Sequence, residues 1–142
     1  MKILKIEPMG NPKVIETDTL SLEWLQEQVG GNIEVVYPFD DPVGIVCDEE
    51  GKLKAKRLNR VLSNAEYWVY DILCGDFLIV GLGEEEEDFC GLSDELLDKY
   101  QKYFWNREYI WFDDQNRVRV TLIDDEDWER DWMADFKEND NE

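Results

Sequence analysis

The residues of this chain that could do chemistry are short groups of carboxylates. Asp40 and Asp41 stand before a proline, residues 48–50 are all acidic, and residues 84–88 form a run of five acidic side chains. Paired carboxylates can serve as general acid and base, or as oxygen ligands for a hard cation. None of these groups has the ligand spacing of a calcium loop, and adjacent acids in turns are usually solvated. We therefore predict no metal site and no cofactor.

Other catalytic groups are scarce. The sequence contains no histidine, so it lacks the commonest general base and metal ligand. Ser63 and Ser93 consequently have no histidine to activate them as nucleophiles. A Gly-Leu-Gly sequence at residues 81–83 resembles the start of a dinucleotide-binding loop, but the motif is incomplete and the acidic run after it would repel a pyrophosphate. We predict no catalytic residue and a protein that is not an enzyme.

Negative charge is the strongest global feature of the chain. It has 35 acidic and 15 basic residues and a formal net charge of -20, which argues against binding nucleic acid or an anionic membrane and favours a basic protein partner. The excess lies in two blocks, residues 84–98 and 113–142. Twenty charges match roughly 34 Å of duplex DNA, close to the diameter of a domain of this size. Carboxylates gathered on one side could imitate DNA; otherwise the charge only maintains solubility.

Two further segments have two interpretations each. Trp128, Trp132 and Phe136 recur at helical spacing among carboxylates, so they could anchor a basic partner or pack on the protein's own sheet. We favour packing, because exposed aromatic side chains promote aggregation. The basic cluster at residues 52–60 could contact phosphate, but we favour a solvated edge strand whose lysines discourage pairing. The residues expected to bind a partner are Asp40, Asp41, Glu84, Glu85, Glu86, Glu87, Asp88, Asp124, Asp125, Glu126, Asp127, Trp128, Asp131 and Trp132.

The elements that must position these residues are short strands and helices. Leu22, Leu25 and Val29 predict the apolar face of a helix over residues 21–29, capped by Ser21 or Thr19 and ended by Gly30. Ser93 begins a second helix, with Leu96, Leu97, Tyr100 and Phe104 facing inward. Strands are expected at residues 2–7, 13–18, 33–39, 43–47, 67–73, 77–80, 109–112 and 117–123, and a short acidic helix at 124–136. The predicted class is α+β with a mostly antiparallel sheet of hairpins.

Residues 1–112 are expected to form one domain, with residues 113–142 an acidic extension packed on it. The three cysteines are odd in number and widely spaced, which is not a disulfide framework. No apolar run is long enough to span a membrane, and the N-terminus lacks the apolar core of a signal peptide. We therefore expect a soluble, cytoplasmic protein.

Several motifs carry a resemblance to a known family. They read GGNIE at residues 30–34, VYPFDDP at 36–42, CDEEGK at 47–52, LNR at 58–60, YDI at 70–72, GDFLIVGLGE at 75–84 and FCGLSDE at 89–95. Over residues 4–104 the chain resembles the family catalogued as domain of unknown function 3846. The resemblance implies a small protein of phages, plasmids or related mobile elements, and it implies no activity and no site residues. The acidic residues after Asp113 depart from the family pattern.

These observations lead to three hypotheses. Small, acidic proteins of mobile elements resemble inhibitors that occupy the DNA-binding channels of host restriction or CRISPR nucleases, so the leading hypothesis is a non-enzymatic inhibitor of that class. The second is an adaptor or scaffold that binds a partner through the aromatic C-terminal helix. The third is a small cation-binding protein that uses carboxylate turns. The oligomeric state is left open.

Overall fold

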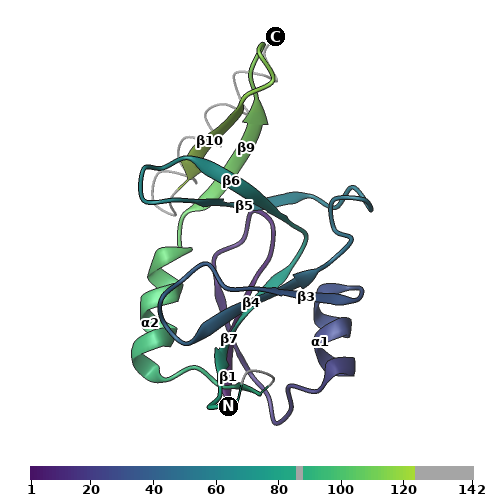
Figure 1. The fold of residues 1–142 in the computed structure, drawn as a ribbon, viewed down its shortest axis with the longest axis vertical. Helices are drawn as coiled ribbons and strands as arrows, with labels where there is room; N and C mark the ends of the chain where they lie inside the picture. The colour runs from purple at the N-terminus through teal and green to yellow at the C-terminus, as the bar shows by residue number, and fades with distance from the viewer. Residues whose placement is uncertain (86–87, 124–142) are drawn as a thin grey trace, which may run out of the picture.

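The computed structural model describes residues 1–85 and 88–123. These residues form two helices, α1 (Leu22–Val29) and α2 (Asp94–Tyr103), and short strands (Figure 1). The strands are β1 (Lys2–Ile6), β2 (Lys13–Glu16), β3 (Ile33–Val36), β4 (Val43–Asp48), β5 (Leu58–Ser63), β6 (Val69–Cys74), β7 (Phe77–Leu82), β8 (Phe89–Cys90), β9 (Arg107–Phe112) and β10 (Val118–Ile123). The fold is α+β with antiparallel pairing, as predicted.

Strand β7 lies at the centre of the main sheet. The strand order is β2-β1-β7-β4-β3, and the short β8 pairs with the last residues of β7. Apart from Leu82, every residue of β7 is buried, because side chains cover both faces of the sheet there. A strand buried on both faces reads as a continuous apolar run, and FLIVG is such a run.

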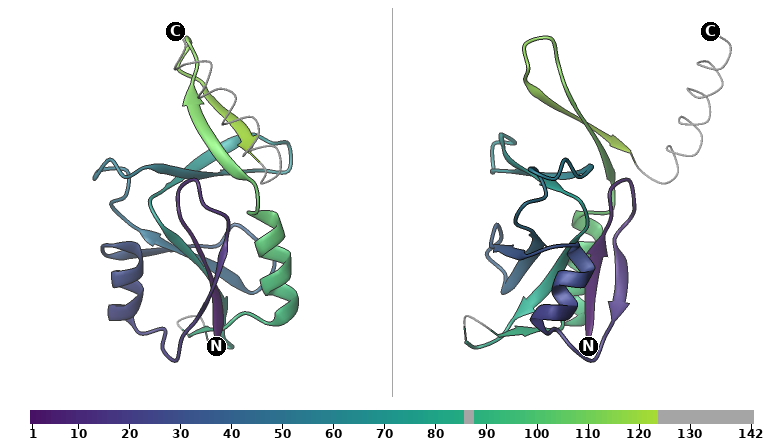
Figure 2. Two further views of the ribbon diagram at one scale, coloured as in Figure 1. Left: turned by 180° about the vertical axis from the view of Figure 1, so that it is seen from behind. Right: turned by 90° about the vertical axis from the view of Figure 1, so that its right-hand side faces the viewer.

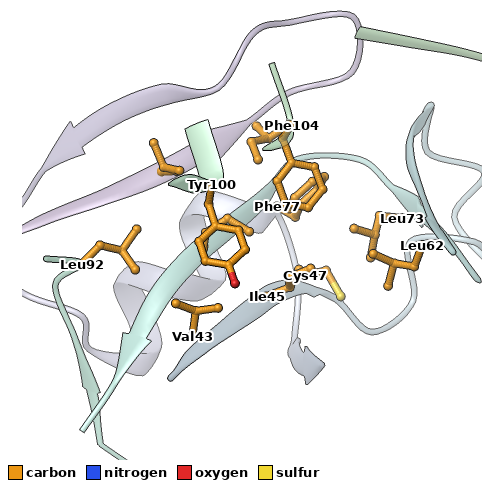
Figure 3. Close-up of a cluster of buried hydrophobic side chains, with 12 residues drawn as sticks. Val43, Ile45, Cys47, Leu62, Leu73, Phe77, Leu92, Tyr100 and Phe104 are labelled. Carbon is orange, nitrogen blue, oxygen red and sulfur yellow. The ribbon is translucent and has the colours of Figure 1, made fainter. Parts of the chain in front are cut away.

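The two faces of this sheet hold separate cores. Helix α1 covers one face, where Leu25 and Val29 pack with Ile3, Val46, Leu78 and Val80. On the other face, Tyr100 and Phe104 at the inner side of α2 pack with residues of β1, β4 and β7 (Figure 3). Leu62 of β5 and Leu73 of β6 join this second core, so the small β5–β6 sheet completes the cover. Figure 2 shows the helices on either side of the sheet.

Both helices begin and end largely as their sequences predict. The side chains of Ser21 and Ser93 accept hydrogen bonds from the backbone N–H three residues later, and Gly30 adopts a left-handed conformation with φ 75°. Leu22 was expected on the inner face of α1, but its side chain is 56% exposed. Its place is taken by Leu20, which precedes the cap and packs in the same core as Leu25, as in a hydrophobic staple.

Several predicted strands have different limits in the structure. Strand β3 ends at Val36, before residue 39, because Pro38 cannot donate a ladder hydrogen bond. The expected edge strand at residues 52–60 was wrong: residues 51–55 form turns, and β5 begins only at Leu58. Beyond the main sheet, β9 and β10 form the predicted hairpin, which projects from the upper end of the molecule (Figures 1 and 2).

A substitution at Gly81 tests how closely the backbone of β8 approaches β7. A Cβ atom at Gly81 would lie 2.6 Å from the carbonyl oxygen of Gly91 and 3.1 Å from that of Cys90. These are backbone atoms that cannot rotate away, so we expect Gly81→Ala to lower the free energy of unfolding by about 2 kcal/mol in urea titration. Gly44→Ala, whose Cβ would meet side-chain carbons of Val35, Leu82 and Tyr37, is the control. An equal loss in both variants would contradict this explanation.

Candidate functional site

One end of the main sheet gathers carboxylates from distant parts of the sequence. Strand β4 starts where β7 ends, because Val43 pairs with Gly81, and the Leu82 N–H donates to the Pro42 carbonyl at 2.9 Å. Strand β1 starts at the same end, where the Leu92 N–H donates to the Lys2 carbonyl at 2.8 Å. We call this surface the acidic end. Its carboxylates are Glu16, Asp18, Asp40, Asp41, Glu84, Glu85, Asp88, Asp94 and Glu95.

The fold therefore brings together two acidic groups that the sequence analysis singled out. Residues 40 and 41 lie in the turn before β4, and residues 84, 85 and 88 lie between β7 and β8. The first turn of α2 adds Asp94 and Glu95, whose negative charge also suits the helix dipole. Glu86 and Glu87 lie outside the described residues, as do Asp124, Asp125, Glu126, Asp127, Trp128, Asp131 and Trp132.

The adjacent residues Asp40 and Asp41 differ in the interactions that their carboxylates make. The Asp41 carboxylate accepts hydrogen bonds from the Lys99 ammonium and, at 2.7 Å, from the Tyr100 hydroxyl. The bond from Lys99 and then that from Tyr100 lower the pKa of Asp41, while burial and the bond to Asp41 raise the pKa of Tyr100. Asp41 thus ties the β3–β4 turn to α2. Asp40 is exposed and has no ion pair among the described residues.

The described carboxylates of the turn between β7 and β8 are exposed to solvent. Backbone hydrogen bonds hold the described part of the turn, from the Gly83 N–H to the Asp88 carbonyl at 2.7 Å and from the Asp88 N–H to the Glu85 carbonyl at 3.0 Å. The side chains of Glu84, Glu85 and Asp88 are exposed and make no ion pair with another described residue. Their negative charge is therefore not offset by an ion pair with another described residue.

The acidic group at residues 48–50 has a different role. Asp48 is only 5% exposed, and its carboxylate binds Lys54 at 2.9 Å and Lys56 at 2.6 Å. Lys56 also donates to the Val29 carbonyl at 2.7 Å, and both lysines donate to the Gly30 carbonyl, so they cap the C-terminus of α1. Lys54 and Lys56 therefore do not form an edge strand, and both are held in ion pairs with Asp48. They hold α1, β4 and the 51–56 turn together.

Sequence reasoning missed Arg60, which is fully buried. Its guanidinium donates to the carbonyls of Gly10 at 2.7 Å and Phe104 at 3.0 Å, and to the Asn59 side chain at 2.9 Å. Burial lowers the pKa of Arg60 to about 10, against the opposing effect of the nearby Glu108, so it stays charged at neutral pH. In the sequence, Arg60 differs from the exposed Arg57 in lying within the LNR motif at residues 58–60, which carries the family resemblance. It has a structural role, because each of its partners belongs to the framework.

Within residues 1–85 and 88–123, no cluster of three or more cysteine, aspartate or glutamate side chains is placed to hold a metal ion. The free thiols of Cys47 and Cys74 are buried, and burial raises the pKa of both, which makes them poor nucleophiles at neutral pH. The helices in these residues are too short to cross a membrane.

The chain belongs to the family described as domain of unknown function 3846 (DUF3846), whose model matches residues 1–105. This match covers the main sheet, both helices and the β5–β6 sheet, and it stops before the β9–β10 hairpin. Comparisons with curated proteins and with solved structures gave no match. The acidic end lies within the family domain, whereas residues 106–142 extend beyond it.

Proposed function

We propose that this protein is a non-enzymatic inhibitor that binds a basic, nucleic-acid-binding protein through its acidic end. The observation that carries the proposal is the hydrogen bond between Pro42 and Leu82, which joins two acidic turns that are about forty residues apart in the sequence. Exposed carboxylates from these turns and from the start of α2 then form one surface. A partner protein whose groove normally binds the phosphates of a nucleic acid could bind these carboxylates instead, because they carry charge of the same sign.

The distribution of basic side chains supports this assignment. Ion pairs join Asp48 to Lys54 and Lys56, Asp71 to Lys52, and Glu7 to Lys13. At the acidic end, Lys99 is bound to Asp41, and Lys2 and the N-terminal ammonium, which donates to the Thr17 carbonyl, also lie there. The negative charge of Asp40, Glu84, Glu85 and Asp88 is thus not offset by ion pairs among the described residues, and it can attract a basic protein over about the 8 Å Debye length. By extension, we propose that the partner is a host nuclease of the restriction or CRISPR type.

The test is affinity capture from an extract of a bacterial host, followed by binding measurements on the captured protein. A variant neutralised at the acidic end carries Asp40→Asn, Glu84→Gln, Glu85→Gln and Asp88→Asn. We expect wild-type protein to capture a DNA-binding protein that is released by salt and displaced by duplex DNA. We expect the variant to bind that protein at least about tenfold more weakly at low salt, because four exposed charges are lost.

A matched control variant loses the same number of negative charges at positions outside the acidic end. It carries Glu27→Gln, Glu34→Gln, Glu50→Gln and Glu66→Gln, all exposed and all outside the acidic end. Equal weakening in the control would mean that only overall charge matters. Capture that resists salt and DNA would contradict the proposal.

The two other hypotheses remain predictions. The adaptor hypothesis depends on the aromatic residues after residue 123, which lie outside the described residues. The cation-binding hypothesis has no support from an arrangement of ligands in the described part of the chain.

A further inference from the structure

The β9–β10 hairpin has one mainly apolar face that the described residues cover only in part. Its register pairs Val118 with Phe112, Val120 with Ile110, and Leu122 with Glu108, so these six side chains share a face. Ile110 is buried near the base, but Phe112 is 51% exposed and Leu122 is 63% exposed. The other face carries Arg107, Tyr109, Trp111, Arg119, Thr121 and Ile123.

The hairpin needs further support to be stable. A two-stranded hairpin is marginal in water unless a third strand or a helix packs on its apolar face. Among the described residues, the body of the protein reaches the hairpin at its base, where the Val61 N–H donates to the Glu108 carboxylate at 2.8 Å. Figure 2 shows the hairpin extending away from the β5–β6 sheet. Exposed apolar patches of this kind mark surfaces suited to contact with another segment or another protein.

We propose that residues 124–142 of the same chain cover this apolar face as an amphipathic helix. The segment follows Ile123 directly, and β10 runs from the tip of the hairpin to its base, so the segment starts beside the face it would cover. Nineteen residues in a helix span about 28 Å, enough to follow a six-residue strand of about 20 Å. Trp128, Trp132 and Phe136 are spaced by four residues and would form the inner side of that helix.

Charge favours this occupant over a second copy of the chain. Residues 124–142 contain ten acidic and two basic residues and are attached at the end of β10. Two copies that paired through this face would bring both acidic segments together, in addition to the repulsion between chains of net charge -20. Covering the face within one chain buries the aromatic side and leaves the carboxylates in water. The inference is independent of the acidic end, and it makes Trp128 and Trp132 part of the core.

Hydrogen exchange of the full-length protein tests this contact. In Trp128→Ser/Trp132→Ser, we expect the backbone amides of β9 and β10 to exchange at least about tenfold faster than in wild type, while exchange in β1, β4 and β7 is unchanged. Asp127→Asn/Asp131→Asn, which alters the same segment without removing apolar side chains, should leave the exchange of β9 and β10 as in wild type. Unchanged exchange of β9 and β10 in the tryptophan variant would overturn the proposal.

A reciprocal measurement guards against a variant that is generally unstable. Hydroxyl-radical labelling of Trp128 and Trp132 should increase in the double variant Phe112→Ser/Leu122→Ser. It should not change in Tyr67→Ser, which removes an exposed aromatic side chain from another hairpin. In wild type, the protection of both tryptophans should persist on hundredfold dilution. Protection that disappears on dilution would identify a second copy as the occupant and overturn the proposal, as would equal labelling in all variants.

Discussion

Replacing Arg60 with alanine is expected to lower the free energy of unfolding by about 4 kcal/mol, a large fraction of the roughly 5–15 kcal/mol that stabilises a typical domain. The side chain is fully buried, so its removal leaves a cavity and two backbone carbonyls without their donor. Those carbonyls belong to Gly10, in the β1–β2 turn, and Phe104, at the end of α2. Loss of Arg60 therefore weakens the contact of both segments with β5. Urea denaturation at neutral pH measures the effect.

Two further variants separate the role of the guanidinium from that of positive charge. Arg57→Ala removes an exposed arginine three residues earlier and should change stability by less than about 0.5 kcal/mol. Arg60→Lys keeps the charge but lacks the planar fork that reaches Gly10, Phe104 and Asn59 together, so it should recover little of the loss. If Arg60→Ala unfolds within about 1 kcal/mol of wild type, the hydrogen-bond network is not a main support of the fold.

Local signals in the sequence were enough to place most elements. Ser21 and Ser93 cap helices because a side-chain oxygen satisfies a backbone N–H within three residues, and that pattern needs no distant partner. Gly30 ends α1 because its left-handed conformation is costly for other residues. The alternation of apolar and polar residues in β10 and the apolar run of β7 likewise reflect whether one face or both faces of a strand are covered, so both strands can be predicted from the sequence alone.

The roles of individual charged residues could not be predicted in this way. Asp48 is the last residue of β4 and borders an acidic turn, as Asp40 lies in one, but Lys54 and Lys56 fold back onto its carboxylate, and Lys56 also binds the end of α1. Arg60 depends on partners 50 and 44 residues away in the sequence. The acidic end depends on β4 lying beside β7, a choice of strand order that side-chain alternation does not determine. Sequence patterns therefore predicted the elements and the acidic groups, but not which groups share a surface.

Asp48→Asn is expected to lower the free energy of unfolding at neutral pH by about 2 kcal/mol. The carboxylate is buried, and it accepts hydrogen bonds from Lys54, Lys56 and the Glu50 N–H. Removing one member of a buried ion pair usually costs more, but both lysines are partly exposed and can recover water. Glu49→Gln, at the exposed neighbouring position, is the control and should be neutral within about 0.5 kcal/mol. Urea titration of the three proteins gives the comparison.

The contribution of Asp48 should also depend on pH in a defined direction. Burial alone would raise the pKa of this carboxyl, but the hydrogen bonds from Lys56, Lys54 and the Glu50 N–H outweigh it and lower the pKa from 3.8 to about 2. The folded state therefore binds this proton more weakly than the unfolded state does, so the stabilisation is complete above pH 3.8 and is lost as the pH falls toward 2. The stability difference between wild type and Asp48→Asn should accordingly be constant from neutral pH to about 4 and then shrink. A difference that stays constant down to the lowest pH at which both proteins fold would show that Asp48 acts through its shape and hydrogen-bonding atoms alone, with no contribution from its charge.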